Sequence, residues 1–250
     1  MDPPSNDSVY PVREDTFLLL PFARSAKGLR LLEVGCGAGR AALDAARAGA
    51  RVVATDLNPA AVRSVRAAAK TERLDVAVVR ADLARGLGRF DRVLVNPPYL
   101  PTRPSERDPD RWHNLALDGG PDGARVTGRI ARLLPGHLTP NGRAYLVVSS
   151  RQDPEALRRI RERWVRAGGS VKSVASRDLP GERLEVWELR LAALRGTTGG
   201  RPRTRGRRSG TGDRPQSRGA NRTGSSRAPG RGRTTAPGAA SGQRRSPAGS

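Results

Sequence analysis

The stretch LLEVGCGAGR, residues 31–40, guides the interpretation of the whole chain. Its first half is an apolar run with the length of a short β-strand. Its second half places Gly35, Gly37 and Gly39 ahead of an Ala-rich, helical run at 39–50. Glycines between a strand and a helix let the backbone pass close to a ligand and leave the first amides of the helix free. The stretch therefore predicts a ligand site at the carboxyl end of the strand, although a plain strand-to-helix turn would use the same glycines.

Strand-like and helix-like stretches alternate from residue 14 to residue 195. We expect strands at 30–34, 51–56, 74–82, 90–95, 142–150, 170–178 and 182–191, helices at 39–50, 59–70, 122–134 and 154–169, and a long loop at 96–121. This alternation predicts right-handed crossovers and an α/β fold with a mostly parallel, seven-stranded sheet and helices on both faces. The loop before the last strand is too short for a crossover, so that strand should run antiparallel.

The net charge of +22 is unevenly distributed along the chain. Residues 196–250 hold thirteen arginines, a single acid (Asp213) and, apart from proline, no apolar side chain larger than alanine. Such a segment cannot bury enough surface to offset the entropy lost on ordering. We therefore expect one globular domain at 1–195 and a disordered Arg/Gly/Ser/Pro-rich basic tail at 196–250. The tail suits weak, salt-sensitive contact with RNA or the ribosome, but a solvated extension without a specific role is the simpler interpretation.

Composition excludes several classes of protein. One cysteine (Cys36) and two histidines leave no internal disulfide, no cysteine-based zinc site and no His-rich metal centre, so we expect no metal. The polar, acidic N-terminus does not resemble a secretory signal. No apolar run approaches the roughly 18 residues that suggest a membrane span. We therefore expect a cytoplasmic protein that makes no membrane contact.

Two acids end the next two strands, at positions that suit a nucleoside. Asp56, followed by Leu57, stands seventeen residues beyond Gly39, the spacing at which an acid accepts hydrogen bonds from ribose hydroxyls. Asp82, followed by Leu83, ends the third strand, where it could face an adenine. Ligands of such sheets bind at this carboxyl edge. Each acid could instead serve as a plain helix or turn cap.

The glycine stretch distinguishes between two kinds of nucleoside cofactor. Arg40 stands where the dinucleotide pattern G-x-G-x-x-G has its third glycine. The stretch from Glu33 to Gly39 instead resembles motif I of the class I methyltransferases that use S-adenosylmethionine (SAM). A zwitterionic methionine moiety tolerates an acid such as Glu33, whereas a pyrophosphate would not. We therefore expect SAM as the cofactor.

The tetrapeptide Asn96-Pro97-Pro98-Tyr99 follows the strand at 90–95, which should lie beside the glycine turn. It resembles the NPPY motif of methyltransferases that alkylate a nitrogen attached to a planar sp² carbon. Such a nitrogen is a weak nucleophile because its lone pair is delocalised. Asn96 Oδ1 and the Pro97 carbonyl can each accept one hydrogen of the NH₂ group, and Tyr99 can stack on its plane. The motif indicates the reaction, but glutamine, adenine and cytosine amino groups all fit it.

Two further stretches carry a family resemblance. VYPVREDTFLLL at 9–20 is similar to the YxPxEDTxLL signature of the HemK2/Mtq2 branch of the HemK protein methyltransferases, although Val12 stands where proline is common. WHNLALDGGPDG at 112–123 resembles the ALdGGxDG stretch that follows NPPY in that superfamily. The resemblance extends from about Val9 to Leu191. The short stretch ahead of the first strand points to the short HemK2 form.

The resemblance implies N5-methylation of the glutamine in the Gly-Gly-Gln loop of a peptide chain release factor. It places Asp15 and Thr16 beside SAM, Asp56 at the ribose, Asp82 at the adenine, and the NPPY motif at the substrate amide. Asp15 and Thr16 could instead only cap a helix. Archaeal and eukaryotic relatives act with a small zinc-binding activator, and the sequence leaves the need for one open.

Two alternatives come from other functional classes. An adenine-N6 methyltransferase acting on DNA or rRNA would suit the basic charge, but the chain has no separate target-recognition domain and no basic platform interleaved with aromatic residues. An RNA- or ribosome-binding module that acts through its tail would not need intact SAM contacts. Trp112 and His113 could line a substrate groove, although a buried structural Trp is as plausible.

Overall fold

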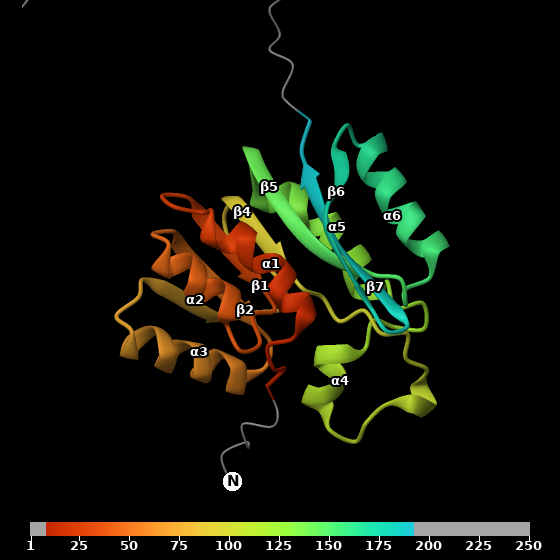
Figure 1. Cartoon of the computed structure of the whole chain (residues 1–250), viewed down its shortest axis with the longest axis horizontal. Helices are drawn as coiled ribbons and strands as arrows, with labels where there is room; N and C mark the ends of the chain where they lie inside the picture. Colours follow the sequence, from red (N-terminus) through yellow and green to blue (C-terminus); the bar gives the residue numbers. More distant parts are fainter. Residues whose placement is uncertain (1–8, 193–250) are drawn as a thin grey trace, which may run out of the picture. The chain divides into compact units, whose positions relative to one another are not determined.

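The computed structural model describes residues 9–192, and the tail expected at 196–250 lies outside them. The described residues form a seven-stranded sheet with the strand order β3-β2-β1-β4-β5-β7-β6 (Figure 1). The strands are β1 Arg30–Val34, β2 Arg51–Asp56, β3 Val76–Arg80, β4 Phe90–Val95, β5 Leu138–Ser149, β6 Ser170–Leu179 and β7 Glu182–Arg190. All seven lie close to the positions that the sequence predicts.

The strand directions confirm the predicted mixed sheet. β1 pairs in parallel with β2 and β4, β3 with β2, and β5 with β4. β7 runs antiparallel to both β5 and β6. Only Pro180 and Gly181 separate β6 from β7, and Gly181 has a φ of +71°. A left-handed glycine in a two-residue turn reverses the chain tightly, so these last strands form a hairpin.

The pairing of β1 with β4 positions the ends of the two central strands. Val34 pairs with Val95, so Gly35 and Asn96 leave the sheet side by side at its carboxyl edge. Every residue of β1 after the first is buried, as are the last three residues of β4. Burial on both faces is typical of central parallel strands, which are held by packing as well as by hydrogen bonds.

Six α-helices and one short 3₁₀ helix accompany the sheet within residues 9–192. They are α1 Glu14–Arg24, α2 Arg40–Arg47, α3 Pro59–Thr71, α4 Arg111–Leu117, α5 Arg125–His137, α6 Pro154–Arg166 and η2 Pro104–Glu106. Asn58 and Asp153 cap α3 and α6, because Asn58 accepts from Ala60 N and Asp153 accepts from Glu155 N. None of these helices is long and apolar enough to cross a membrane.

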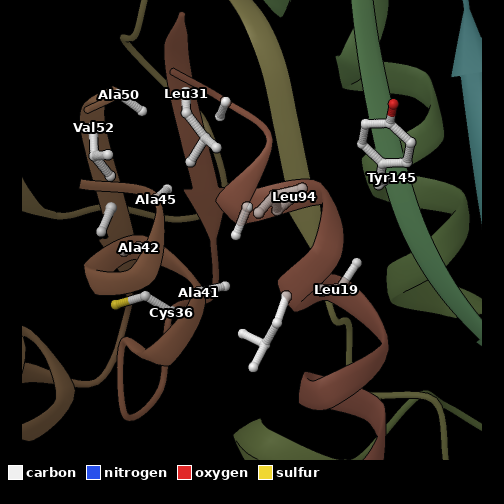
Figure 2. Close-up of a cluster of buried hydrophobic side chains, with 14 of the residues drawn as sticks. Leu19, Leu31, Cys36, Ala41, Ala42, Ala45, Ala50, Val52, Leu94 and Tyr145 are labelled. Atoms are coloured by element: carbon white, nitrogen blue, oxygen red, sulfur yellow. The ribbon is translucent and has the colours of Figure 1, made fainter. Parts of the chain in front are cut away.

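An apolar core lies on each face of the sheet, as predicted. On one face α1, α2 and α3 pack over the strands, and the small side chains of Ala41, Ala42 and Ala45 let α2 lie close to α1 and β1 (Figure 2). On the other face α5 and α6 contribute Ile130, Leu134 and Trp164. The indole of Trp164 also donates to Arg190 O at 3.0 Å, which ties α6 to the end of β7.

Three helical segments differ from the sequence-based expectation. The region 96–121, expected to be one long loop, contains η2 and α4. α4 buries none of its residues and begins where Asp110 Oδ1 accepts from Trp112 N at 2.8 Å, so it leaves no apolar periodicity in the sequence. α5 begins at Arg125 and not at 122, because Asp122 Oδ1 accepts from Ala124 N and holds a turn there.

The third segment, α1, was not among the expected helices. Pro21 lies inside it, and a proline within a helical pattern normally marks an end or a kink. Leu19, Leu20 and Ala23 nevertheless face the core. Asp15 lies within the first turn of α1 and is not its N-cap, because the N-cap position belongs to Arg13, which makes no side-chain cap bond.

Candidate active site

A cavity of about 940 Å³ opens at the carboxyl edge of the sheet, beyond the ends of β1, β2, β3 and β4. Ligands of doubly wound sheets bind at this edge. Its walls include every residue that the sequence suggested for the site except Gly37. These residues are Asp15, Thr16, Glu33, Gly35, Gly39, Asp56, Leu57, Asp82, Leu83, Asn96, Pro97, Pro98 and Tyr99.

The glycine turn and Asp56 form one hydrogen-bonded unit. Gly37 N donates to Asp56 Oδ2 at 2.9 Å, and Asn58 N donates to Asp56 Oδ1 at 2.8 Å. Gly37 therefore acts by holding Asp56 and does not line the cavity itself. Gly39 has a φ of +74°, and a Cβ there would lie 2.4 Å from Val65 Cγ2. Both the backbone conformation and the lack of space require glycine at this position.

Glu33 is a buried carboxyl group beneath the turn. Its side chain is 6% exposed, and Glu33 Oε2 accepts from Ala42 N at 2.7 Å in the first turn of α2. Burial raises the pKa of Glu33 from 4.5 to about 8, since an ionised carboxylate loses its hydration there. The hydrogen bond from Ala42 opposes that shift only in part. Burial therefore favours the protonated form of this carboxyl group in the cavity wall.

Asp82 and Leu83 form the wall beyond β3. Asp82 accepts from Arg129 Nη2 through both carboxylate oxygens, at 3.1 and 2.8 Å, so α5 contributes to this wall. Leu83 has a φ of +58°, a left-handed conformation that costs a non-glycine residue about 1–2 kcal/mol. Strain of this kind is concentrated at ligand-binding sites, where the surrounding structure holds it in place.

Asn96 lines the cavity and has a buried side-chain oxygen without a hydrogen-bond partner. Among residues 9–192, its Oδ1 and Arg92 Nε are the buried side-chain polar atoms without a hydrogen-bond partner. Asn96 lines the cavity together with the two prolines and the tyrosine that follow it. A buried carbonyl oxygen left without a donor costs about 1–3 kcal/mol, so this atom requires an explanation, and a catalytic role is one such explanation.

Asp15 holds the ring of Tyr99 in place. Asp15 is 2% exposed, and its Oδ2 accepts from Tyr10 OH at 2.8 Å and from Tyr99 OH at 3.2 Å. Its Oδ1 accepts from Thr16 N at 2.6 Å. Burial and the neighbouring Asp15 carboxylate both raise the pKa of each phenol well above its usual range, so both tyrosines remain donors. The N-terminal segment therefore orients the aromatic ring of the NPPY motif.

Other side chains close the outer part of the cavity. Trp112 and His113, which the sequence suggested for a substrate groove, both line it. Tyr10, Arg151 and Glu182 line it as well, and sequence reasoning missed their roles. Tyr10 lies in the N-terminal signature and could have been found there. Arg151 lies in the turn after β5 and Glu182 is the first residue of β7, so no local pattern indicates them.

Comparison with known proteins gives a consistent picture. The family model described as methyltransferase small domain matches residues 12–114. The putative protein N5-glutamine methyltransferase of Methanocaldococcus jannaschii is 37% identical over 144 residues, which cover 57% of this chain and 73% of that protein. Methyltransferase HEMK2 of Mus musculus is 37% identical over 162 residues, which cover 60% of this chain and 75% of the mouse protein.

A solved structure supports the same relationship. The Mtq2–Trm112 complex of E. cuniculi, described as responsible for methylation of the termination factor eRF1, matches with a TM-score of 0.56 and 27% identity. The match covers 74% of this chain and 99% of that chain. The resemblance predicted from the sequence motifs is thereby confirmed. The chain belongs to the family of class I protein N5-glutamine methyltransferases that includes HEMK2 and Mtq2.

Proposed function

We propose that this methyltransferase binds SAM in the cavity and methylates the side-chain nitrogen of a glutamine, within the Gly-Gly-Gln loop of a peptide chain release factor. SAM supplies an electrophilic methyl group on a sulfonium. The protein's own residues hold the cofactor, orient the acceptor nitrogen and keep water away from it.

The residues of the cavity fit SAM. Asp56 is fixed by two backbone amides and keeps free lone pairs for the ribose hydroxyls. The wall of Asp82 and Leu83 would hold the adenine. Glu33 would hold the cationic methionine end, because a nearby positive charge favours ionisation of its carboxyl group. The glycine at 35 leaves room for the cofactor beside the backbone.

The observation that carries the proposal is the unpartnered Asn96 Oδ1. Its position beside the glycine turn follows from the pairing of Val34 with Val95. An incoming NH₂ group can donate one hydrogen to this oxygen and the other to the Pro97 carbonyl. Two fixed acceptors would aim the nitrogen lone pair at the methyl group and stabilise the positive charge that develops during transfer.

Tyr99 completes the acceptor site. Its ring is held by the bond from its hydroxyl to Asp15, so it can stack on a planar amide without first becoming ordered. Both phenols have raised pKa values and remain neutral, so neither serves as a general base at neutral pH. The nitrogen can lose its proton to solvent after transfer, because the alkylated group is strongly acidic.

We propose release factors as the substrate because of the activities for which related proteins are named. The two curated relatives are named as a protein N5-glutamine methyltransferase and as HEMK2, and the Mtq2–Trm112 complex is described as methylating eRF1. A planar primary amide fits a clamp built from two oxygen acceptors and one aromatic ring. The adenine amino group fits the same chemistry, so the choice between them depends on an acceptor assay.

The acceptor assay offers labelled SAM with a release factor, its loop Gln→Ala variant, and duplex DNA or rRNA. We expect label on the intact release factor alone, because only that acceptor presents the glutamine amide. Mass spectrometry should place the methyl group on the loop glutamine. Label on nucleic acid but not on the release factor would contradict the proposed substrate.

Asn96→Ala separates catalysis from cofactor binding. We expect methyl transfer to fall by about 10²–10³-fold, because one fixed acceptor for the reacting group is lost, while the Kd for SAM stays near that of the wild type. Asp56→Ala is the complementary variant and should weaken SAM binding. Calorimetry with SAM and single-turnover transfer measure the two effects. An active Asn96→Ala variant would refute the clamp.

The affinity for SAM should depend on pH through Glu33. Burial raises the pKa of Glu33 to about 8, so protonation of this carboxyl group in the free protein increases as the pH falls below that value. Binding of a cation beside it would expel that proton, so affinity should rise as pH increases from 6 to 7.5. Glu33→Gln keeps the acceptor for Ala42 N but cannot ionise, and should flatten this rise. Calorimetry in buffers of different ionisation enthalpy would detect the released proton. If the affinity of Glu33→Gln for SAM rises as steeply with pH as that of the wild type, Glu33 is not the source of the pH dependence.

The proposal includes a small zinc-binding activator that docks on the edge strand β3. Residues 81–89 connect β3 to β4 without a helix, so the sheet face beside α5 is thinly covered there. On that face Val53 and Val79 are partly exposed and Ala77 is exposed. A free strand edge beside apolar side chains suits a partner that adds a strand. The related Mtq2 was solved as a complex with Trm112.

Ala77→Arg tests this docking surface. A large charged side chain there should weaken binding of a Trm112-type activator at least about tenfold, because the apolar contact is lost, and leave SAM affinity unchanged. Ser173→Arg, exposed on β6 at the opposite edge of the sheet, is the matched control. Co-purification and titration of the activator measure the effect. Equal binding by both variants would place the activator elsewhere.

A further inference from the structure

Residues 118–123, Asp-Gly-Gly-Pro-Asp-Gly, lie against the chain that follows the NPPY motif, and we call them the DG loop. Leu100 N donates to Leu117 O at 3.1 Å, just ahead of this loop. Gly119 N donates to Leu100 O and Thr102 N donates to Gly120 O, each at 2.9 Å. The residues immediately after Tyr99 are thus bonded through their backbone to the DG loop and its flank.

Two glycines let the backbones stack without intervening side chains. A Cβ on Gly123 would lie 2.5 Å from Tyr99 O, and a Cβ on Gly119 would lie 2.3 Å from Gly123 O. Contacts below 3.0 Å are essentially never found for a real Cβ, so something would have to shift. Gly119 packs on Gly123, and Gly123 packs on the carbonyl oxygen of Tyr99. A shift of Gly119 would therefore also displace the backbone of the NPPY motif.

Gln152 supports the DG loop from the side of β5. It is 2% exposed, and its Nε2 donates to Gly123 O and to Thr127 Oγ1, each at 2.9 Å. Its Oε1 accepts from Ser149 N at 2.9 Å. A buried amide with these bonds satisfied fixes the relative positions of the segments that it joins. The end of β5, the start of α5 and Gly123 are thereby connected.

Asp118 fastens the beginning of the same loop. It is 8% exposed, and its Oδ1 accepts from Gly120 N at 2.7 Å. Its Oδ2 accepts from Arg107 Nε at 3.1 Å and pairs with Arg125 Nη2 at 3.3 Å. The carboxylate thus joins the segment before α4 to the first residue of α5.

Asp118 is the residue of the DG loop that lines the cavity, whereas Gly119, Gly120, Gly123 and Gln152 lie behind its wall. We propose that the DG loop, backed by Gln152, is a positioning element that sets the depth of Tyr99 and of the NPPY backbone in the active site. This inference rests on the proposed function, in which Tyr99 and the motif's carbonyl receive the substrate amide. The loop acts on catalysis through Tyr99 and not through the cofactor.

Gly119→Ala tests the proposal, because the φ of Gly119 lies outside the left-handed region and only the added methyl group changes. We expect kcat for release-factor methylation to fall by about 100-fold, the loss typical of a misplacement of about 1 Å. The KM for SAM should remain close to wild type, whereas the unfolding temperature should fall, because the atoms that must shift belong to the backbone of Gly123. Gly136→Ala, where the new Cβ meets no atom within 4 Å, is the matched control and should keep wild-type kcat.

Gln152→Met is a second variant, which removes the side-chain hydrogen bonds while keeping the length of the side chain. It should also lower kcat without changing the KM for SAM. Unchanged kcat in both variants would overturn the proposal. Loss of SAM binding along with activity would overturn it too, because the loop would then support the whole site and not the motif alone.

A readout independent of the acceptor separates this inference from the proposed substrate. The chain has three tyrosines, Tyr10, Tyr99 and Tyr145. In protein labelled with fluorotyrosine, Gly119→Ala should shift the ¹⁹F resonance of Tyr99, assigned with Tyr99→Phe, and leave that of Tyr145 in place. An unmoved Tyr99 resonance contradicts the inference. If the Tyr99 resonance shifts but the protein does not methylate a release factor, the proposed substrate is wrong and the positioning role of the DG loop still holds.

Discussion

The parallel pairing of Val34 with Val95 is the contact on which the active site depends. It joins two strands that are buried on both faces, so their relative position is fixed by backbone hydrogen bonds and by packing together. Neighbouring strands lie about 4.8 Å apart. Because Gly35 and Asn96 directly follow the paired residues, this spacing sets how far apart they leave the sheet. The glycine turn and the NPPY motif, which we propose to hold the cofactor and the acceptor, are therefore positioned by the sheet itself.

The strands and the cofactor side of the site were predictable because they depend on local sequence. Short apolar runs bounded by turn residues indicated the strands, and Asn58 and Asp153, each followed by a proline, cap α3 and α6 in the way those residue pairs favour. The glycine turn indicated the ligand edge, and the cavity lies there. The NPPY stretch marked Asn96, whose oxygen the structure leaves unpartnered.

Other parts of the site depend on contacts between distant residues, and no local pattern carries them. Tyr99 OH reaches Asp15 across 84 positions in the sequence, and Gln152 Nε2 reaches Gly123 O across 29. α4 was missed for a different reason, since local hydrogen bonds hold it and no apolar stripe marks it. Gly37 is not among the residues that line the cavity, and its amide donates to Asp56 across 19 positions.

In the proposed mechanism, the unpartnered oxygen of Asn96 is needed for methyl transfer but lowers the stability of the folded protein. Before the acceptor arrives, the protein tolerates a desolvated carbonyl whose cost, about 1–3 kcal/mol, is a sizeable part of the stability of a typical domain. An apolar side chain of similar size would remove that burden and, in the proposed mechanism, the reaction with it. Such conflicts are usual where chemistry requires a group that folding alone would reject. Engineering for heat resistance should therefore begin far from this residue.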